Sequence, residues 1–293
     1  MFAFCEYEHL LRMAGFCIAC ALLLARVGGL GDDRAHLKPQ QDATAPTTPQ
    51  QDAAAPADAE TNGTARLAAF AAACGDADFA PVVRLPPRGQ YVVRNFSFGV
   101  DGARGGWDCA PRRWLRRPAT QRCAVWDVGR YDERRQNMYT TEMFEDASKS
   151  IDGYEGVRDV HIGLDVGGPP GTPVYAPADG VVHSFGYNEE PGDYGHVVVT
   201  EHEIGGVRAW FLFGHLDAAS CSWKRVGAPV RRGDRVGAIG AWRENGHWPS
   251  HVHFQISLAE PATHDMPGVV SLASRERALL DYPDPRLVAG PLY

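Results

Sequence analysis

Five residues in the second half of the chain could together form a hydrolytic metal site. They are His161 and Asp165 in the segment HIGLD, His215 in FGHLD, and His251 and His253 in HVHFQI. Imidazole nitrogens and carboxylate oxygens are ligands that zinc uses in proteins, and a catalytic zinc takes three of them and keeps one position for water. The five residues supply enough groups for three ligands and two additional imidazoles that could transfer protons.

The spacing of these residues restricts their geometry. His251 and His253 are two residues apart in a strand-like run, 251–258, so both side chains point to one face. His161 and Asp165 would be about 13 Å apart on a straight strand, whereas ligand atoms around a tetrahedral zinc lie about 3.3 Å apart. The segment between them must therefore bend, and Gly163 predicts a tight loop there rather than a helix.

Residues 156 to 260 resemble the lysostaphin/LytM-type zinc metallopeptidases, most of which cut peptide bonds in bacterial peptidoglycan. The resemblance depends on the order and spacing of HxxxD at 161–165, GTPVYAP at 171–177 with DGVV at 179–182, YGHVVV at 194–199, GHL at 214–216, VxxGDxVG at 230–237 and HxHF at 251–254. Two departures are the aromatic Phe213 before Gly-His-Leu, and Gln255 where the family often has Glu.

The resemblance implies a role for each of the five residues. His161, Asp165 and His253 are expected to bind one zinc ion per chain, and His215 and His251 are expected to be the unligated catalytic pair. The implied activity is that of a zinc-dependent metalloendopeptidase, a hydrolase that uses a zinc-activated water on peptidoglycan cross-links or another peptide substrate.

The pattern of strands and turns predicts a mainly β fold. Short runs rich in Val, Tyr and Phe alternate with Gly, Pro and Asp turns in residues 151–293, which is typical of an antiparallel sheet or sandwich. The family fold is such a sheet with a groove-shaped active site. Trp242, His247 and Trp248 could line this groove, but the tryptophans could equally pack in the core, and His247 could be a solvated loop residue.

Two other functions remain open at this stage. A catalytically silent binding or regulatory protein could share the fold, although such proteins usually lack ligands that are all present here. A lipoyl- or biotinyl-like carrier module would need a lysine at an exposed hairpin tip. Lys224 is the only lysine in the predicted domain and lies outside any hairpin pattern.

The N-terminal segments predict export. Residues 1–30 resemble a signal peptide with an apolar stretch at 13–25, while Glu6 and Glu8 leave a membrane anchor as an alternative. Residues 31–66 have the composition of a disordered linker. We therefore expect a secreted or extracytoplasmic protein. It would contact a membrane only through such an anchor.

Residues 67–150 are predicted to form a small mixed subdomain before the peptidase domain at 151–293. It would begin with a helix from Thr64 to Cys74. The arginine-rich segment 104–135 within it could be a solvated face or a surface that binds an anionic polymer. The net charge of −7 and the absence of nucleic-acid motifs in the sequence argue against nucleic-acid binding, and we expect a monomer.

Four cysteines remain after the signal segment: Cys74, Cys109, Cys123 and Cys221. An even number in a secreted chain predicts two disulfides with three possible connectivities. Cys109 and Cys123 are the favoured pair, because they close a short loop of about 15 residues.

Overall fold

The computed structural model describes residues 56–97 and 126–293. All of them belong to one compact unit that runs from residue 53 to residue 293. The predicted signal segment, most of the predicted linker, and Cys109 and Cys123 lie outside the described residues. Within the described part of the chain, no helix has the length and apolar character needed to cross a bilayer.

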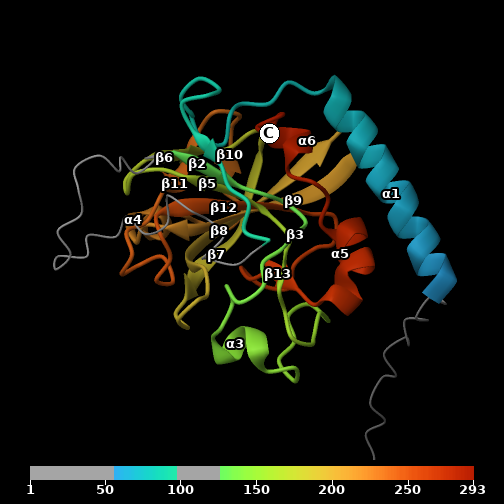
Figure 1. Ribbon diagram of the computed structural model, residues 1–293. Coiled ribbons are helices and arrows are strands. Elements are labelled where there is room, and N and C mark those ends of the chain that lie inside the picture. Colours follow the sequence, from blue (N-terminus) through green and yellow to red (C-terminus); the bar gives the residue numbers. More distant parts are fainter. Residues whose placement is uncertain (1–55, 98–125) are drawn as a thin grey trace, which may run out of the picture. The chain divides into compact units, whose positions relative to one another are not determined.

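An eight-stranded sheet forms the centre of the fold (Figure 1). Its strands, in spatial order, are β1 (Val92–Val93), β2 (Asp127–Gly129), β5 (Leu164–Gly167), β12 (His251–Ser257), β9 (Val207–Leu216), β8 (Gly195–Ile204), β7 (Gly180–Asn188) and β10 (Pro229–Val230). All neighbours in this sheet are antiparallel except the parallel pair β1 and β2. The prediction of a mainly β, antiparallel fold is confirmed.

Both faces of the central strands are buried. Along β9, Phe211 and Phe213 pack into one hydrophobic cluster, while Trp210 and Leu212 pack into a second cluster. Successive side chains of a strand point to opposite faces, so a strand covered on both sides reads as a continuous apolar run. The run AWFLF in this strand has that pattern. The central sheet is therefore a rigid support for the side chains at its strand ends.

Two small sheets flank this centre. The first pairs β11 (Arg235–Ala238) with β6 (Pro173–Tyr175), and the second contains β13 (Val269–Val270), β4 (Val160–His161) and β3 (Glu133–Arg134). Because β4 and β5 belong to different sheets, the chain passes from one sheet to another between His161 and Asp165.

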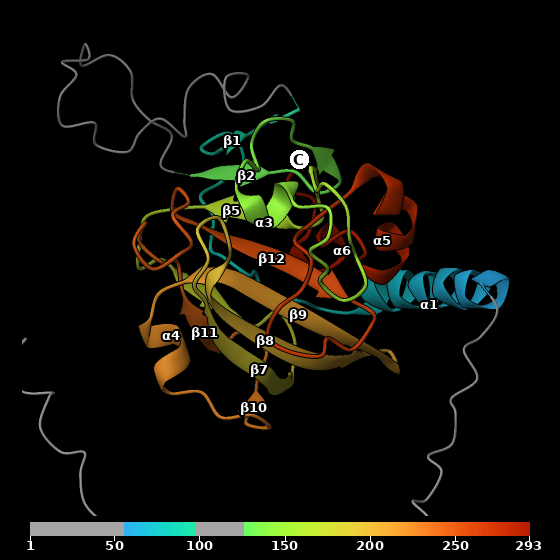
Figure 2. The same cartoon turned by 90° about the horizontal axis from the view of Figure 1, so that it is seen from below.

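Helices cover the sheet. They are α1 (Pro56–Asp76), α3 (Glu142–Glu145), α4 (Ala219–Ser222), the 3-10 helix η2 (Leu272–Ser274), α5 (Arg275–Asp281) and α6 (Arg286–Ala289). Figure 2 shows α1 extending beside α5 and β9, and Phe70 of α1 joins the same hydrophobic cluster as Val288 of α6. The C-terminal residues thus pack against the hydrophobic core together with α1.

Three boundary predictions are wrong. Helix α1 begins at Pro56 and not at Thr64, so the linker predicted for 31–66 is helical in its last part. The segment 67–150 is no separate subdomain among the described residues, because β2 pairs with β5 and β3 pairs with β4. An open strand edge is a ready template for further pairing, and β2 covers that edge of β5.

The cysteine prediction also needs correction. Cys74 and Cys221 are free thiols rather than half of a two-disulfide set. Cys74, near the C-terminal end of α1, is buried in the core cluster, while the Cys221 Sγ donates hydrogen bonds to the carbonyl oxygens of Gly186 and Val197. The two thiols therefore lie in separate environments and do not form a disulfide with each other.

Candidate metal centre and cleft

Strand register places two of the candidate ligands opposite each other. His253 of β12 lies opposite Asp165 of β5 on one side and opposite Gly214 of β9 on the other side. Directly opposite residues in an antiparallel pair have Cβ atoms only about 4.5–5.5 Å apart. The same register brings His215, the residue after Gly214, to the edge of this group.

His161 reaches the same point from the neighbouring sheet. The chain bends at Gly163, as the ligand spacing predicts, but the backbone there does not adopt a left-handed conformation. The glycine is needed for space, since a Cβ atom at this position would lie 2.2 Å from Cε1 of His253. Gly163 lets the His253 ring approach the backbone between the other two candidate ligands.

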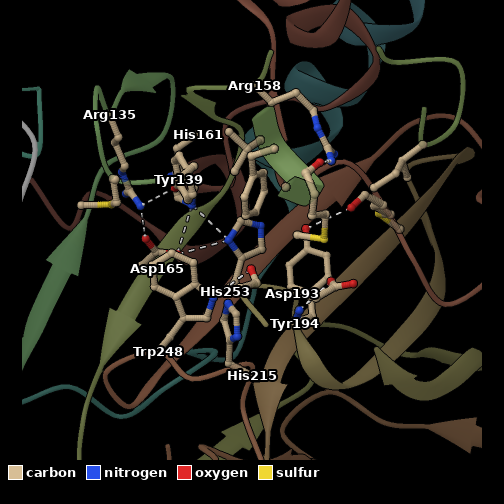
Figure 3. Close-up of a pocket in the computed structure, with 18 of the residues that line it drawn as sticks. Arg135, Tyr139, Arg158, His161, Asp165, Asp193, Tyr194, His215, Trp248 and His253 are labelled. Atoms are coloured by element: carbon tan, nitrogen blue, oxygen red, sulfur yellow. Dashed lines mark hydrogen bonds and ion pairs between the residues drawn. The ribbon is translucent and has the colours of Figure 1, made fainter. Parts of the chain in front are cut away.

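Three ligand atoms converge in a triangle (Figure 3). The Nε2 atom of His161 lies 3.0 Å from Nδ1 of His253 and 3.1 Å from Oδ1 of Asp165, and the third edge, from His253 to Asp165, is 3.2 Å. These edges are close to the about 3.3 Å expected around tetrahedral zinc with bonds of about 2.0–2.1 Å. All three side chains are buried. The set could hold one metal ion.

Hydrogen bonds on the far side of each ring assign the tautomers. The Nδ1–H group of His161 donates to the carbonyl oxygen of Arg130 at 2.8 Å, and the Nε2–H group of His253 donates to Oε1 of Gln255 at 2.9 Å. A neutral imidazole has one N–H group, so the nitrogen that faces the triangle carries a lone pair in each case. Two lone pairs and a carboxylate oxygen facing one another fit a bound cation.

Arg135 fixes the third ligand from behind. Its Nη1 donates to Oδ2 of Asp165 at 2.7 Å, and its Nε donates to Glu133 at 3.0 Å. Burial raises the pKa of the Asp165 carboxyl, but nearby positive charge outweighs this and holds the pKa well below its usual range; at neutral pH that charge is the guanidinium of Arg135. Burial and Arg135 also lower the pKa of His161 to about 4. Asp165 is therefore ionised and His161 neutral at neutral pH, as metal binding requires.

The two remaining histidines lie beside the triangle. The ring centroids of His215 and His251 are 4.3 Å apart, and Nε2 of His251 lies 3.7 Å from Oδ1 of Asp165. Each ring donates its Nδ1–H to a carbonyl oxygen, His215 to Asn245 at 2.8 Å and His251 to Pro249 at 2.6 Å. Burial lowers the pKa of both rings. Both are neutral imidazoles with an unprotonated Nε2.

His215 also has an unusual backbone. Its φ of 61° lies in the left-handed region, which non-glycine residues seldom occupy. Two backbone hydrogen bonds hold it, one from its N–H to Tyr194 at 2.9 Å and one from the N–H of Gly240 to its carbonyl at 2.8 Å. Strained positions of this kind persist where surrounding structure fixes them, and they are concentrated at functional sites.

A cleft opens on the candidate metal centre. Its walls include Arg135, Tyr139, Phe144, Arg158, Asp193, Tyr194, Trp248, Asp265 and Met266 together with all five candidate site residues. Trp248 is therefore a cleft residue. Trp242 and His247 lie outside its lining; their rings contact each other with centroids 5.9 Å apart, and Trp242 is 52% exposed.

Residues 159–264 match the family model of Peptidase family M23. This segment is a peptidase M23 domain. The resemblance to lysostaphin/LytM-type peptidases is thereby confirmed. The DD-carboxypeptidase/endopeptidase Mpg of Neisseria meningitidis is 36% identical to this chain over 100 residues, which are 34% of this chain and 20% of that protein. The cell division protein DipM of Caulobacter vibrioides is 29% identical over 107 residues, 36% of this chain and 16% of that protein.

A solved structure of a zinc-containing peptidase from Vibrio cholerae is 28% identical, with a TM-score of 0.28, covering 36% of this chain and 28% of that one. The chain spans about a fifth or less of the length of the curated relatives. The M23 match begins after Arg135, Tyr139, Phe144 and Arg158, so one cleft wall comes from outside the matched segment.

The sequence did not identify several of these cleft residues. Arg135 ends the arginine-rich segment that was expected to be a solvated face or a polymer-binding surface, yet it is only 2% exposed and bonds a candidate ligand. Nothing in that run of arginines distinguishes it. Gln255 had a stronger signal, since it lies two residues after His253 on the same strand face.

Proposed function

We propose that the M23 domain is a zinc-dependent endopeptidase that hydrolyses peptide cross-links in peptidoglycan. The observation that carries this proposal is the triangle of His161, Asp165 and His253, whose lone pairs converge within 3.2 Å. Two imidazoles and one carboxylate are a ligand set found in catalytic zinc sites. The relatives support the substrate, because one is named a DD-carboxypeptidase/endopeptidase and another a cell division protein.

A zinc ion held by these three ligands would lower the pKa of a water molecule to about 7 and polarise the scissile carbonyl. His215 and His251 would serve the proton transfers, since each has an unprotonated Nε2 and an Nδ1 fixed by a backbone carbonyl. One ring accepts a proton from the attacking water. The imidazolium so formed can donate a hydrogen bond to the developing oxyanion or a proton to the leaving amine.

The proposed substrate has consequences for location. Peptidoglycan lies outside the cytoplasmic membrane, so we infer an extracytoplasmic or secreted protein that reaches it after export. The signal segment at 1–30 and the monomeric state stay predictions. The carrier alternative has no support, because Lys224 is only 8% exposed and follows helix α4 rather than lying at a hairpin tip.

Two substitutions on one strand separate the proposed ligands from the proposed catalytic pair. His253→Ala removes a ligand atom, so the chain should lose most of its zinc together with its activity. His251→Ala should keep close to one zinc per chain while hydrolysis falls by about 10² to 10⁴, the usual contribution of a positioned acid or base. Zinc is measured by mass spectrometry of the metal, and hydrolysis by mass spectrometry of digested peptidoglycan.

The control is the full-length unmodified chain with and without a chelator. Loss of zinc from His251→Ala with retention in His253→Ala would mean that the two histidines have the opposite roles. A zinc-loaded native chain that cleaves no peptidoglycan or other peptide would contradict the peptidase proposal and favour a binding protein on this fold.

A further inference from the structure

The cleft holds charged residues that have no part in the hydrolysis proposed above. Arg158, Asp193 and Asp265 line it together with the metal centre. Figure 3 shows Arg158 and Asp193 on the opposite side of His253 from Arg135 and Asp165. These groups therefore face the part of a bound substrate that lies beside the reacting bond.

Arg158 is a buried cation with unused hydrogen-bonding capacity. It is 2% exposed, its Nη2 donates to the carbonyl oxygen of Met143, and its guanidinium carbon lies 5.2 Å from the ring centre of Phe144. Its Nε is buried and has no hydrogen-bond partner among the described residues. Among the described residues, no carboxylate oxygen lies within 4.0 Å of a guanidinium nitrogen of Arg158. A buried charge of this kind is costly unless an opposite charge accompanies it.

Asp265 is the complementary case. Its Oδ1 is buried and likewise lacks a partner in the described part of the chain. Burial and the nearby Asp193 raise the pKa of its carboxyl to about 7. Asp193 is itself held in place, since it accepts a hydrogen bond from the backbone N–H of Tyr194 at 2.6 Å. A cation beside Asp265 would favour its ionised form.

The two unsatisfied groups have opposite charges and share one cleft. A ligand with only an ammonium would leave Arg158 unpaired, and a ligand with only a carboxylate would leave Asp265 unpaired, each with a buried polar group unsatisfied. A ligand with both charges satisfies both residues. The guanidinium can bind a carboxylate through two parallel N–H groups, and a carboxylate oxygen can accept from an ammonium.

We propose that Arg158 and Asp265 form a subsite for a zwitterionic group, an ammonium and a carboxylate on one carbon atom, as at the free end of a diaminopimelate side chain. The proposal rests on the proposed peptidoglycan substrate and specifies which cross-link peptides are preferred. Apolar side chains around the two charges, those of Met143, Phe144 and Met266, would contact the methylene groups of such a side chain.

Binding of three synthetic stem peptides to the zinc-loaded full chain tests this subsite. The peptides differ at one side chain. It ends in the diaminopimelate zwitterion, in the lysine ammonium alone, or in diaminopimelate whose amine is acetylated so that only the carboxylate charge remains. Calorimetric titration of the native chain should show the first bound about 10- to 100-fold more tightly than the other two.

Asp265→Asn should weaken binding of the diaminopimelate peptide by about tenfold or more and leave the acetylated peptide unchanged. Arg158→Met should abolish the preference for diaminopimelate over lysine. If loss of the Met143 contact unfolds that variant, Asp265→Asn decides the question alone. Glu260→Gln is the matched control, because it removes one negative charge at an exposed surface pair with Arg208. It should change no affinity.

Equal affinity of the native chain for the three peptides, or no measurable binding, would overturn the subsite. So would an Asp265→Asn variant that stays folded and binds the diaminopimelate peptide as tightly as the native chain does. Because affinity and cleavage are measured in separate assays, a chain that shows the preference but cuts no peptide retains the subsite and loses the peptidase function. Cleavage without any preference gives the reverse conclusion.

Discussion

Gln255 should control how tightly the metal centre binds zinc, although it is not a ligand. Its Oε1 accepts the Nε2–H of His253 at 2.9 Å, and the side chain is fully buried. Gln255→Leu keeps a similar volume but removes this acceptor. The proton of His253 could then move to Nδ1, the atom that faces Asp165, and zinc would have to displace it.

The expected loss can be estimated from two sources. Removing a hydrogen-bond partner of a metal-binding histidine usually weakens metal affinity by about 10- to 100-fold, equivalent to about 1.4–2.7 kcal/mol. Leaving a buried N–H group without an acceptor costs about 1–3 kcal/mol, which is of the same size. Gln255→Glu retains an acceptor at the same place, so it should bind zinc at least as tightly as the native chain does.

Zinc affinity is measured by competition with a chromophoric chelator at neutral pH. Ser257→Ala is the control on the same strand, because it removes a partly buried hydrogen bond of 2.6 Å from Ser257 to the carbonyl oxygen of Ala259, away from the candidate ligands. The reasoning fails if Gln255→Leu binds zinc as tightly as Ser257→Ala and the native chain. It also fails if Gln255→Glu loses as much affinity as Gln255→Leu.

Two further substitutions test the surroundings of the site and the acid stability of the fold. Gly163→Ala should displace the His253 ring, since the added Cβ would lie 2.2 Å from that ring, and the zinc content should fall. Gly75→Ala is the control, because its Cβ would have no neighbour within 4 Å, and it should leave the zinc content unchanged. A Gly163→Ala variant fully loaded with zinc would contradict the idea that this glycine makes room for the ring. Burial lowers the pKa of His202 to about 4 from an ordinary 6.5, so the unfolded chain binds this proton first as pH falls. The resulting loss of folding stability lies between those two pKa values and amounts to about 2 kcal/mol from pH 7 to pH 5. His202→Gln should lose that part of the pH dependence in urea unfolding, and an unchanged slope would refute it.

Sequence alone determined the features that depend on local order along the chain. Short runs rich in Val, Tyr and Phe between turns in 151–293 predicted strands, and two of these strands in the structure are β8 and β9. The two-residue spacing of His251 and His253 placed both rings on one strand face, and the short HxxxD spacing required a bend. Neighbours in sequence fix such relations, because strand geometry relates residue i to residue i+2 without reference to the rest of the fold.

Tertiary structure alone decided what lies behind the candidate ligands. Arg135 meets Asp165 across a separation of 30 residues, and β2 reaches the edge of β5 from a segment that the sequence assigned to another subdomain. Strand register also gives Gly163 its function, by bringing the His253 ring against its backbone. These contacts arise when distant strands pair and bury charge together, and no local pattern in the chain records which buried carboxylate a given arginine will meet.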